Sequence, residues 1–324
     1  MTKRNLGSFV VCAMLFALCS SAEAQQPQKL SRIGFLGSAP AYFIDAFRGQ
    51  LLDLGWIEGQ NIVIEYRSDE GRVDLLPNLA ADLVRLKVDV IVGTTTDQAL
   101  AAQKATRTIP IVFAGTSDPV GSGLVASLAR PGGNITGIRL LSAELGGKRL
   151  EILKETIPKL SQVAVLWRLL GAGQKPQMKE IEGAARSLSV QIQPVGVEGP
   201  NDIENGFSAL NRKPAGALIV LSSPWFSKYR ARIVELAENH RLPAIYPGNE
   251  FADAGGLMSY GANRSEQYRR AAIYVDKILK GTKPADLPVE QPMKFEFVIN
   301  LKAANQISLT IPPNVLARAD KVIR

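Results

Sequence analysis

Polar side chains that could hold a small solute follow apolar runs in the first half of this 324-residue sequence. Three consecutive threonines come after Val88–Val92. A helix predicted to start there, with Thr96 or Asp97 as its cap, offers free N–H groups that suit a carboxylate. An aspartate in the Gly-Thr-Ser-Asp-Pro loop after Ile109–Ala114 could pair with an ammonium group. The candidate ligand residues here are Ser38, Thr94, Thr95, Thr96 and Asp118.

Each of these residues also has an ordinary structural interpretation, which the sequence leaves open. The threonines could simply cap the helix, and Asp118 could form an Asx turn closed by Pro119. Ser38 could be a plain turn residue.

The second half offers aromatic and hydroxyl groups at similar positions. Two serines precede Pro224, a good first helical residue, so they could cap a helix, bind solute or do both. The ring of Trp167 could stack on the solute, and burial of this tryptophan in the core is the alternative. The candidates are Trp167, Ser222, Ser223, Tyr246, Asn249, Glu250 and Tyr260. Together with the first set they fit an amino acid or a similar zwitterion, although pockets of this kind also take sugars and nucleosides.

Catalytic and metal chemistry has few residues available. His240 is the single histidine, and it ends the helical pattern Ser227–His240, where a C-terminal cap role accounts for it. A secreted α/β enzyme is the alternative, and its catalytic relay would depend on His240. Gly121–Ala126 matches the dinucleotide pattern G-x-G-x-x-A but lies too far after its strand, so we interpret its glycines as a tight turn. We expect no enzyme activity, no cofactor and no metal site.

The first residues have the pattern of a cleavable secretory signal peptide. Lys3 and Arg4 precede an apolar stretch, and Ala22–Ala24 forms a small-x-small cleavage pattern. We predict a signal peptide over residues 1–24 and a periplasmic location. Cleavage would remove Cys12 and Cys19, so the mature chain would have no thiol.

The net charge of +8 raises the question of nucleic acid, since the chain has 38 basic and 30 acidic residues. Basic and acidic residues are mixed, however, as in Arg67/Asp69/Glu70 and Lys148/Arg149/Glu151, and only 6% of residues are aromatic. The mixture predicts a solvated surface and no nucleic-acid binding.

Apolar runs alternate with helical patterns along the chain. Strands are predicted at Ile33–Leu36, Ile62–Tyr66, Val88–Val92, Ile109–Ala114, Val163–Trp167, Val190–Val197, Ala217–Leu221 and Pro243–Tyr246. Helices are predicted at Asp74–Lys87 with Asp74 as cap, around Leu124–Leu128, at Ser227–His240, and at Asn263–Lys280 with Asn263 as cap. Repeated β-α-β units predict an α/β fold with parallel, doubly wound sheets.

We predict two such Rossmann-like lobes joined by a multi-strand hinge. Lobe 1 would take residues 30–138 and 262–284, and lobe 2 would take residues 139–261 and 285–324. Two lobes joined in this way can close around a solute in their shared cleft. One continuous sheet is the alternative.

Longer segments carry a family resemblance. They include DLGWIEGQNIVIEYRSDEGRVDLLPNLAADLVRLKVDVIV, SDPVGSGLVASLARPGGNITG, GKRLEILKE, RIVELAENHRLPAIY and RRAAIYVDKILKGTKPADLPVEQPMKFEFVINLK. In this order the chain resembles the periplasmic substrate-binding components of ABC transporters of the tryptophan/tyrosine-type group. One segment departs, because similar proteins commonly have an Asn/Asp-Pro turn where this chain reads Arg168–Gly173.

The resemblance implies a type I periplasmic binding fold that captures a small polar solute, with an aromatic or other amino acid as the candidate. It also implies delivery of the solute to ABC permease and ATPase subunits in the inner membrane, and we expect a monomer. A periplasmic ligand sensor that signals to a membrane receptor is the alternative, with the same pocket and a different partner.

Overall fold

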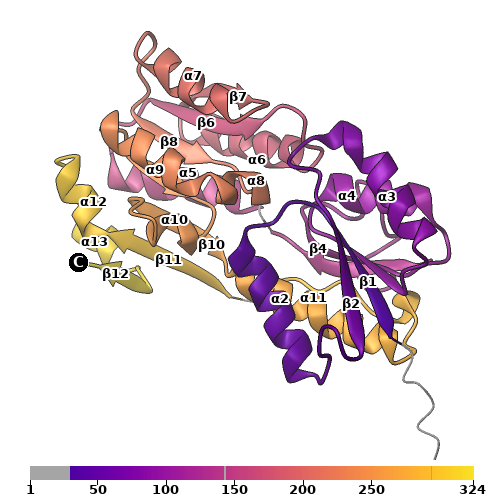
Figure 1. The fold of residues 1–324 in the computed structure, drawn as a ribbon. Helices are drawn as coiled ribbons and strands as arrows, with labels where there is room; N and C mark the ends of the chain where they lie inside the picture. Colours follow the sequence, from indigo (N-terminus) through magenta and orange to yellow (C-terminus); the bar gives the residue numbers. More distant parts are fainter. Residues whose placement is uncertain (1–29, 142–143, 293) are drawn as a thin grey trace, which may run out of the picture. The chain divides into compact units, whose positions relative to one another are not determined.

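The computed structural model describes residues 30–141, 144–292 and 294–324 (Figure 1). The predicted signal peptide, residues 1–24, lies outside the described residues. None of the helices in the described ranges is both long and apolar enough to cross a membrane.

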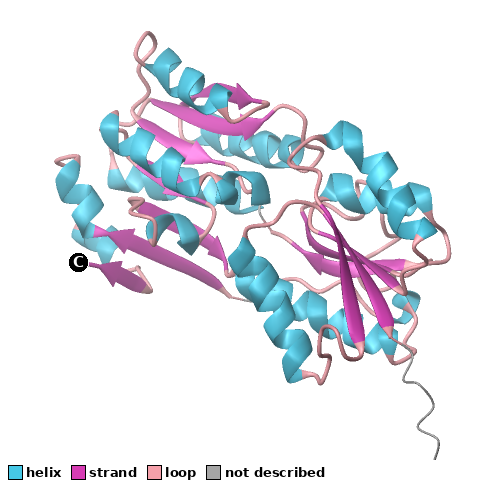
Figure 2. Cartoon of the chain, in the orientation of Figure 1, coloured by secondary structure: helices cyan, strands magenta, loops and turns pink. Residues whose placement is uncertain are grey.

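Five parallel strands form the first sheet, in the order β2-β1-β3-β4-β5. Figure 2 distinguishes the strands of the protein, in magenta, from its helices, in cyan. The strands are β1 (Ser31–Leu36), β2 (Ile62–Arg67), β3 (Val90–Gly93), β4 (Ile111–Thr116) and β5 (Ile135–Arg139). The helices that accompany them are α2 (Ala41–Asp53), α3 (Leu76–Arg85), α4 (Thr96–Ala105) and α11 (Arg264–Leu279), with the 3-10 turns η1 (Val73–Leu75) and η2 (Pro284–Asp286). The predicted parallel, doubly wound arrangement is confirmed for this sheet.

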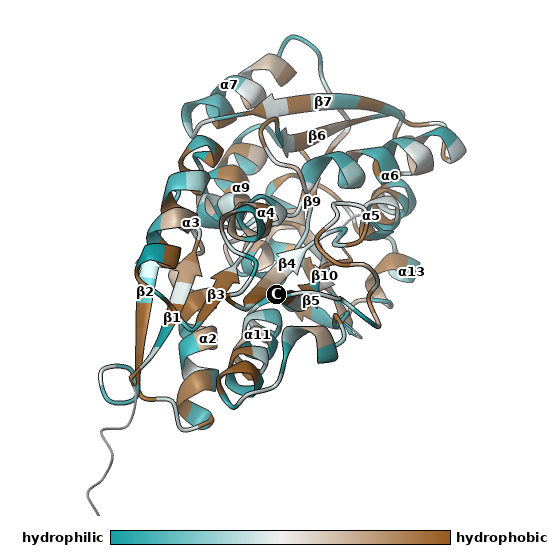
Figure 3. Cartoon of the chain, turned by 90° about the vertical axis from the view of Figure 1, so that its right-hand side faces the viewer, coloured by the Kyte–Doolittle hydropathy of each residue, from teal (hydrophilic) through white to brown (hydrophobic). Residues whose placement is uncertain are grey.

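Both faces of this sheet are covered, which explains why its strands lack polar alternation. Val90 and Val92 of β3 contribute to the core beneath α2 and α11, whereas Ile91 contributes to the core beneath α3 and α4. Successive side chains of a strand point to opposite faces, so both sets must be apolar. The hydropathy colouring shows these hydrophobic strands with helices around them (Figure 3).

Seven strands form the second sheet, in the order β12-β11-β10-β9-β8-β6-β7. They are β6 (Gln162–Arg168), β7 (Gln191–Val197), β8 (Ala217–Val220), β9 (Ala244–Tyr246), β10 (Met258–Ala262), β11 (Phe295–Asn300) and β12 (Lys321–Ile323). All neighbouring pairs are parallel except β10 with β11, which is antiparallel. The sheet is therefore parallel in its first part and mixed at the edge that the end of the chain adds.

Helices also cover both faces of the second sheet. They are α5 (Glu144–Thr156), α6 (Gln174–Ser187), α7 (Asn201–Leu210), α8 (Pro224–Lys228), α9 (Arg230–Asn239), α10 (Asn249–Ala252), α12 (Leu301–Gln306) and α13 (Pro313–Leu316). Val163 and Val165 of β6 pack with α5 and α6, while Ala164 and Leu166 pack with α7 and α9. The alternation along β6 repeats the design of the first sheet.

The chain passes between the two sheets three times. It leaves β5 for α5, returns from β10 to α11, and leaves again before β11. Helix α11 thus packs against α2 of the first sheet although it follows a strand of the second (Figure 1). Leu287 and Val289 pack in the two cores of the first sheet, and Glu290 bridges Ile138. We therefore propose that the third crossing follows Glu290 rather than Pro284.

Two local predictions were wrong. No helix forms around Leu124–Leu128, because Leu124 and Val125 N–H groups both donate to the Pro119 carbonyl in a compact turn that includes Gly123 at φ +74°. Asp74 does not cap a helix either, since it lies inside η1 and α3 begins at Leu76.

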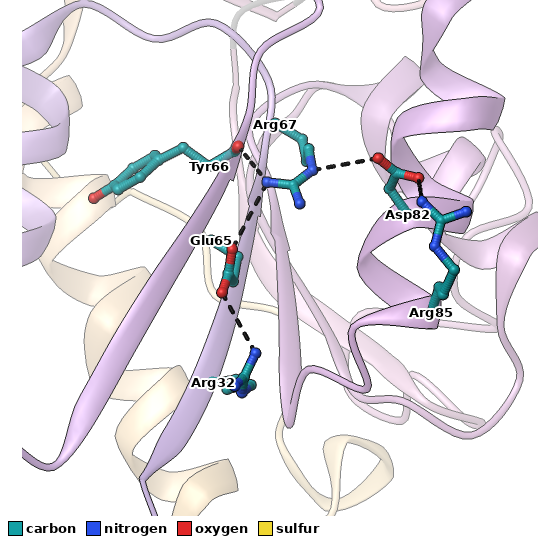
Figure 4. Close-up of polar contacts among 6 residues, drawn as sticks. All are labelled: Arg32, Glu65, Tyr66, Arg67, Asp82 and Arg85. Carbon is teal, nitrogen blue, oxygen red and sulfur yellow. Dashed lines mark hydrogen bonds and ion pairs between the residues drawn. The ribbon is translucent and has the colours of Figure 1, made fainter. Parts of the chain in front are cut away.

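An ion-pair network links the end of edge strand β2 to α3 (Figure 4). The Arg67 guanidinium lies 3.8 Å from Glu65 and 3.6 Å from Asp82, and Asp82 also pairs with Arg85. The Arg67 carbonyl accepts the Gly37 N–H at 2.9 Å. These contacts fix the backbone immediately before Ser68 and Asp69.

The predicted cap of α11 is confirmed. The Asn263 Oδ1 accepts the Glu266 N–H at 3.1 Å, and Gly281 with φ +101° follows the last turn. Replacing Asn263, which is exposed, with alanine should lower the free energy of unfolding by about 1 kcal/mol, because the Glu266 N–H in the first turn of α11 loses its acceptor. Urea unfolding would measure this loss, and Asn263→Asp should restore stability. Equal stability of the alanine variant would contradict the capping role.

Candidate functional site

A cavity of about 660 Å³, counted with the space open to solvent at its mouth, is lined by residues that follow strands of both sheets. Ser38, Asp69 and Thr95 come after β1, β2 and β3 of the first sheet. Arg168 ends β6 and Ser222 follows β8 in the second sheet. The carboxyl ends of parallel strands therefore supply the lining from both sides.

The strand order explains why the cavity lies at these strands. In each sheet the chain leaves two neighbouring central strands toward opposite sides: β1 and β3 in the first, β6 and β8 in the second. A crevice opens outside the carboxyl ends of such a pair. Ser38 and Thr95 flank the first crevice, and Arg168 and Ser222 flank the second.

Asp69 supplies a buried carboxylate to the cavity. Asp69 is only 5% exposed. Its carboxylate oxygens accept hydrogen bonds from the Ser38 hydroxyl at 2.8 Å and from the Gln98 amide at 3.4 Å. Across the described ranges, no lysine or arginine lies within ion-pair distance of it. A buried carboxylate without a paired cation is suited to accept an ammonium group.

A second carboxylate and a helix start lie beside it. Thr95 caps α4 through its hydroxyl, which accepts the Gln98 N–H at 3.3 Å, so the predicted cap at Thr96 or Asp97 was one or two residues late. Burial raises the pKa of Asp97, whose oxygens accept the Ala172 N–H at 3.1 and 3.2 Å. The first turn of α4 offers N–H groups and a positive dipole end to an anion.

Arg168 reaches across the cavity from the second sheet. Its Nη2 donates to the Gly71 carbonyl at 2.8 Å and to the Glu198 carbonyl at 3.1 Å. Its guanidinium lies 4.7 Å from the Trp225 ring centre. Burial lowers the pKa of Arg168, while the charges of Asp69 and Asp97 act in the opposite direction. The cavity thus contains one cation and two carboxylates.

Two glutamines fix the loop after β8. Gln177 exchanges two hydrogen bonds with the Ser222 backbone, at 2.8 and 3.1 Å. Gln174 donates to the same carbonyl at 2.9 Å and accepts the Arg168 N–H at 3.2 Å. This network holds the ends of β6 and β8 together and orients Arg168.

Five of the predicted ligand residues line the cavity: Ser38, Thr95, Thr96, Ser222 and Ser223. Ser223 also caps α8, since its hydroxyl accepts the Trp225 N–H at 3.2 Å. Thr94 lies behind the lining, fully buried, with its N–H and hydroxyl donating to the Gln98 side-chain oxygen. Thr94 therefore supports the lining without reaching the cavity.

Three other predicted residues are directed elsewhere. Asp118 accepts the Gly121 N–H at 2.8 Å, which is the local turn left open as its alternative. Trp167 packs against the core beside α5 and α6 because it points to the opposite face of β6 from Arg168. Tyr246 is 1% exposed and stacks on Phe251 at 5.0 Å. The structure does not bring these side chains to the cavity.

The remaining candidates also lie outside the cavity lining. Asn249 donates to the Glu296 carboxylate and accepts from the Ser259 hydroxyl. Glu250 accepts from the Ser227 hydroxyl at 2.8 Å. Tyr260 packs its ring against Phe295 and Phe297.

The most polar lining residues were not predicted. Asp69 follows β2 at the same sheet edge, so the strand-end rule could have found it, but its charged neighbours suggested a solvated surface. That interpretation was wrong for Asp69 and also for Arg149, which is 1% exposed. Gln98, Gln174 and Gln177 carry no sequence signal, since amides inside helical patterns are common. His240 is the C-cap of α9 and does not line the cavity.

The family comparison matches nearly the whole chain. A family model described as "ABC transporter substrate binding protein" matches residues 41–323. A tyrosine-binding protein from Clostridioides difficile (strain R20291) is 28% identical over 270 residues, which cover 80% of this chain and 75% of that protein.

Two solved structures are similar in fold and sequence. A conserved domain protein from Vibrio cholerae gives a TM-score of 0.83 at 28% identity, covering 91% of this chain and 100% of that one. An ABC domain from Streptococcus pneumoniae in complex with L-Trp gives a TM-score of 0.82 at 25% identity, with the same coverage of both chains. These likenesses extend over both sheets.

Proposed function

This chain belongs to the ABC transporter substrate-binding protein family, and we propose that it captures an amino acid in the cavity between its two sheets. Proteins of this family bind substrates rather than transform them. The observation that carries the choice of an amino acid is the placement of Asp69 near the start of α4 in one cavity. A zwitterion needs an anion for its ammonium group and N–H donors for its carboxylate, and this cavity offers both.

The groups divide between the two ends of the solute. The Asp69 carboxylate accepts hydrogen bonds from the ammonium group of the solute, while the Ser38 hydroxyl donates to Asp69 Oδ1 and holds the carboxylate in place. The first turn of α4 receives the solute carboxylate, with the Thr95 and Thr96 hydroxyls beside it. Trp225, Leu140 and Leu170 give an apolar wall for the solute side chain. The relatives described as binding tyrosine and L-Trp support an aromatic side chain there.

Closure of the two lobes would trap the solute. Contacts that join the two sides of the cavity, such as Arg168 to the Gly71 carbonyl and Ala172 to Asp97, would form only in the closed arrangement. A solute shifts the open and closed populations by its differential affinity for the closed form. We propose that lobe 1 comprises residues 30–138 with 262–290, and that lobe 2 comprises the rest of the mature chain.

We further propose that the protein works in the periplasm after loss of residues 1–24 and delivers its solute to a permease with its ATPase. The family membership and the pattern of the first residues support this place and partner. We propose that the protein acts as a monomer.

A thermal-unfolding screen of the purified protein tests the solute class. Aromatic amino acids at about 100 times their dissociation constant should stabilise the fold by roughly 2.7 kcal/mol, which raises Tm by about 5–10 °C. The panel includes other amino acids, sugars, nucleosides and short carboxylic acids. A shift with sugars or nucleosides alone would replace the amino acid by that class, and no shift with any compound would contradict solute binding.

A further inference from the structure

Two buried arginines line a second, smaller cavity next to the segments that join the sheets. Arg149 of α5 is 1% exposed, and Arg264, the first residue of α11, is 3% exposed. The cavity measures about 230 Å³ when the space open to solvent at its mouth is counted, and its interior has room for about one water-sized species. Leu140 and Ala262, which stand at the start of the first and second crossings, also line it.

The nitrogens of both arginines are only partly satisfied. Arg149 Nε donates to the Tyr260 carbonyl at 2.8 Å, but its Nη1 is buried without a partner. Arg264 Nη1 donates to the Ser222 hydroxyl at 3.0 Å, while its Nε and Nη2 are buried without partners. In the part of the chain that the structure describes, no carboxylate forms an ion pair with either guanidinium.

Two uncompensated cations in one cavity are an unfavourable arrangement. Burial lowers the pKa of Arg149 to about 10, so it still carries its proton at neutral pH. The Phe43 ring, 5.2 Å from the Arg264 guanidinium, compensates only part of that charge. Buried charges are ordinarily paired, and buried donors ordinarily have acceptors. A small anion would supply both the counter-charge and the missing acceptors.

We propose that this cavity binds a monovalent anion between Arg149 and Arg264. The anion is either a free halide or one carboxylate oxygen of the captured solute; the second source rests on the proposed capture of an amino acid and would take its carboxylate to the arginines instead of the first turn of α4. Ser222 and Leu140 line both cavities, so the cavity with the two arginines adjoins the one proposed to hold the solute. Because α5 packs on the second sheet and α11 on the first, the anion joins the two sheets beside their connections.

Thermal unfolding without solute tests the free anion. Chloride up to about 200 mM replaces the bulky sulfonate MES at constant ionic strength, and we expect Tm to rise by about 3 °C or more. Arg264→Met, which keeps the apolar stem, should abolish the rise. Arg269→Met is the matched control on the same helix, since Arg269 is partly exposed and paired with Glu266. It should retain the rise.

Binding of an amino acid and of its carboxamide tests the other source. If the solute supplies the anion, Arg264→Met should weaken the binding of the amino acid about tenfold and leave the affinity for its carboxamide unchanged. A chloride-dependent Tm with unchanged solute affinity assigns the site to a free halide. Absence of both effects, with solute still bound by the wild-type protein, overturns the anion site and leaves the proposed function standing. If chloride raises Tm but the wild-type protein binds no solute, the anion site stands and the proposed function is overturned.

A third measurement does not depend on the variant's folding. Wild-type crystals soaked in bromide should show an anomalous peak within about 3.5 Å of both guanidinium groups. If Arg264→Met fails to fold, Arg149→Met takes its place in the two assays. An empty cavity in bromide, together with a Tm independent of chloride and an unaltered preference for the carboxylate, contradicts the proposal.

Discussion

Replacing Asp69 with asparagine should weaken amino-acid binding by at least about 30-fold. Removing one partner of a buried, hydrogen-bonded charge pair costs about 2 kcal/mol or more, because the solute ammonium group is then buried without a counter-charge. The asparagine oxygen can still accept from the Ser38 hydroxyl, so the lining keeps its shape. Isothermal titration calorimetry with the solute found in the thermal screen measures the loss.

The neighbouring Glu70 provides the control. It is exposed and does not line the cavity, so Glu70→Gln removes the same charge one residue away and should bind as the wild type does. The solute-free Asp69→Asn protein should be at least as stable as the wild type, because a buried carboxylate without a paired cation is removed. Equal affinity of Asp69→Asn and wild type would rule out Asp69 as the ammonium partner.

Replacing Gly71 with alanine should lower solute affinity by about 30-fold through closure rather than through solute contact. A Cβ atom at Gly71 would lie 2.6 Å from Cδ1 of the Trp225 ring, which stacks under Arg168. The ring therefore cannot move without losing that stack. Overpacking of this kind costs about 2 kcal/mol, and the cost falls on the closed arrangement alone. Small-angle scattering with saturating solute should show a more extended particle than the wild type.

Gly59→Ala separates this clash from backbone strain. Gly59 has φ +85° and Gly71 has φ +82°, so alanine is strained by about 1–2 kcal/mol at either position. Nothing lies within 4 Å of a Cβ at Gly59, however. Both variants should lose similar stability, whereas only Gly71→Ala should lose affinity. If the two variants lose affinity equally, the steric account of closure is wrong.

The sequence predicted strands β1–β4 and β6–β9 and the edge at which polar residues gather, but not β5 or the mixed edge formed by β10, β11 and β12. Buried strands leave uninterrupted apolar runs, and polar residues just beyond them must lie at the carboxyl edge of the sheet. This local rule was enough to place Ser38, Thr95 and Ser222 at the cavity. The family resemblance added the closing lobes and the solute, and the family membership is confirmed.

Side-chain direction at the strand ends was harder to predict. Trp167 was predicted to contact the solute, but the next residue, Arg168, lines the cavity instead. Neighbouring residues of a strand point to opposite faces of the sheet, so an error of one residue selects the wrong face. Asp69 and Arg149 were taken for surface charges because mixed-charge segments usually are, and only packing between distant elements buries them. Gln174 and Gln177 acquire their roles from the loop after β8, which is more than 40 residues away in the chain.

The interleaved chain path also determines the order in which this protein can fold. Helix α11 covers a face of the first sheet, and β11 and β12 complete the second. A nascent chain that ends near residue 260 therefore leaves open the part of this apolar face that α11 covers, although all five strands of that sheet have been synthesised. Contacts between segments this distant slow folding, since long loops must close before they form. We therefore expect neither sheet to complete its core before the segment from α11 to β12 has been synthesised.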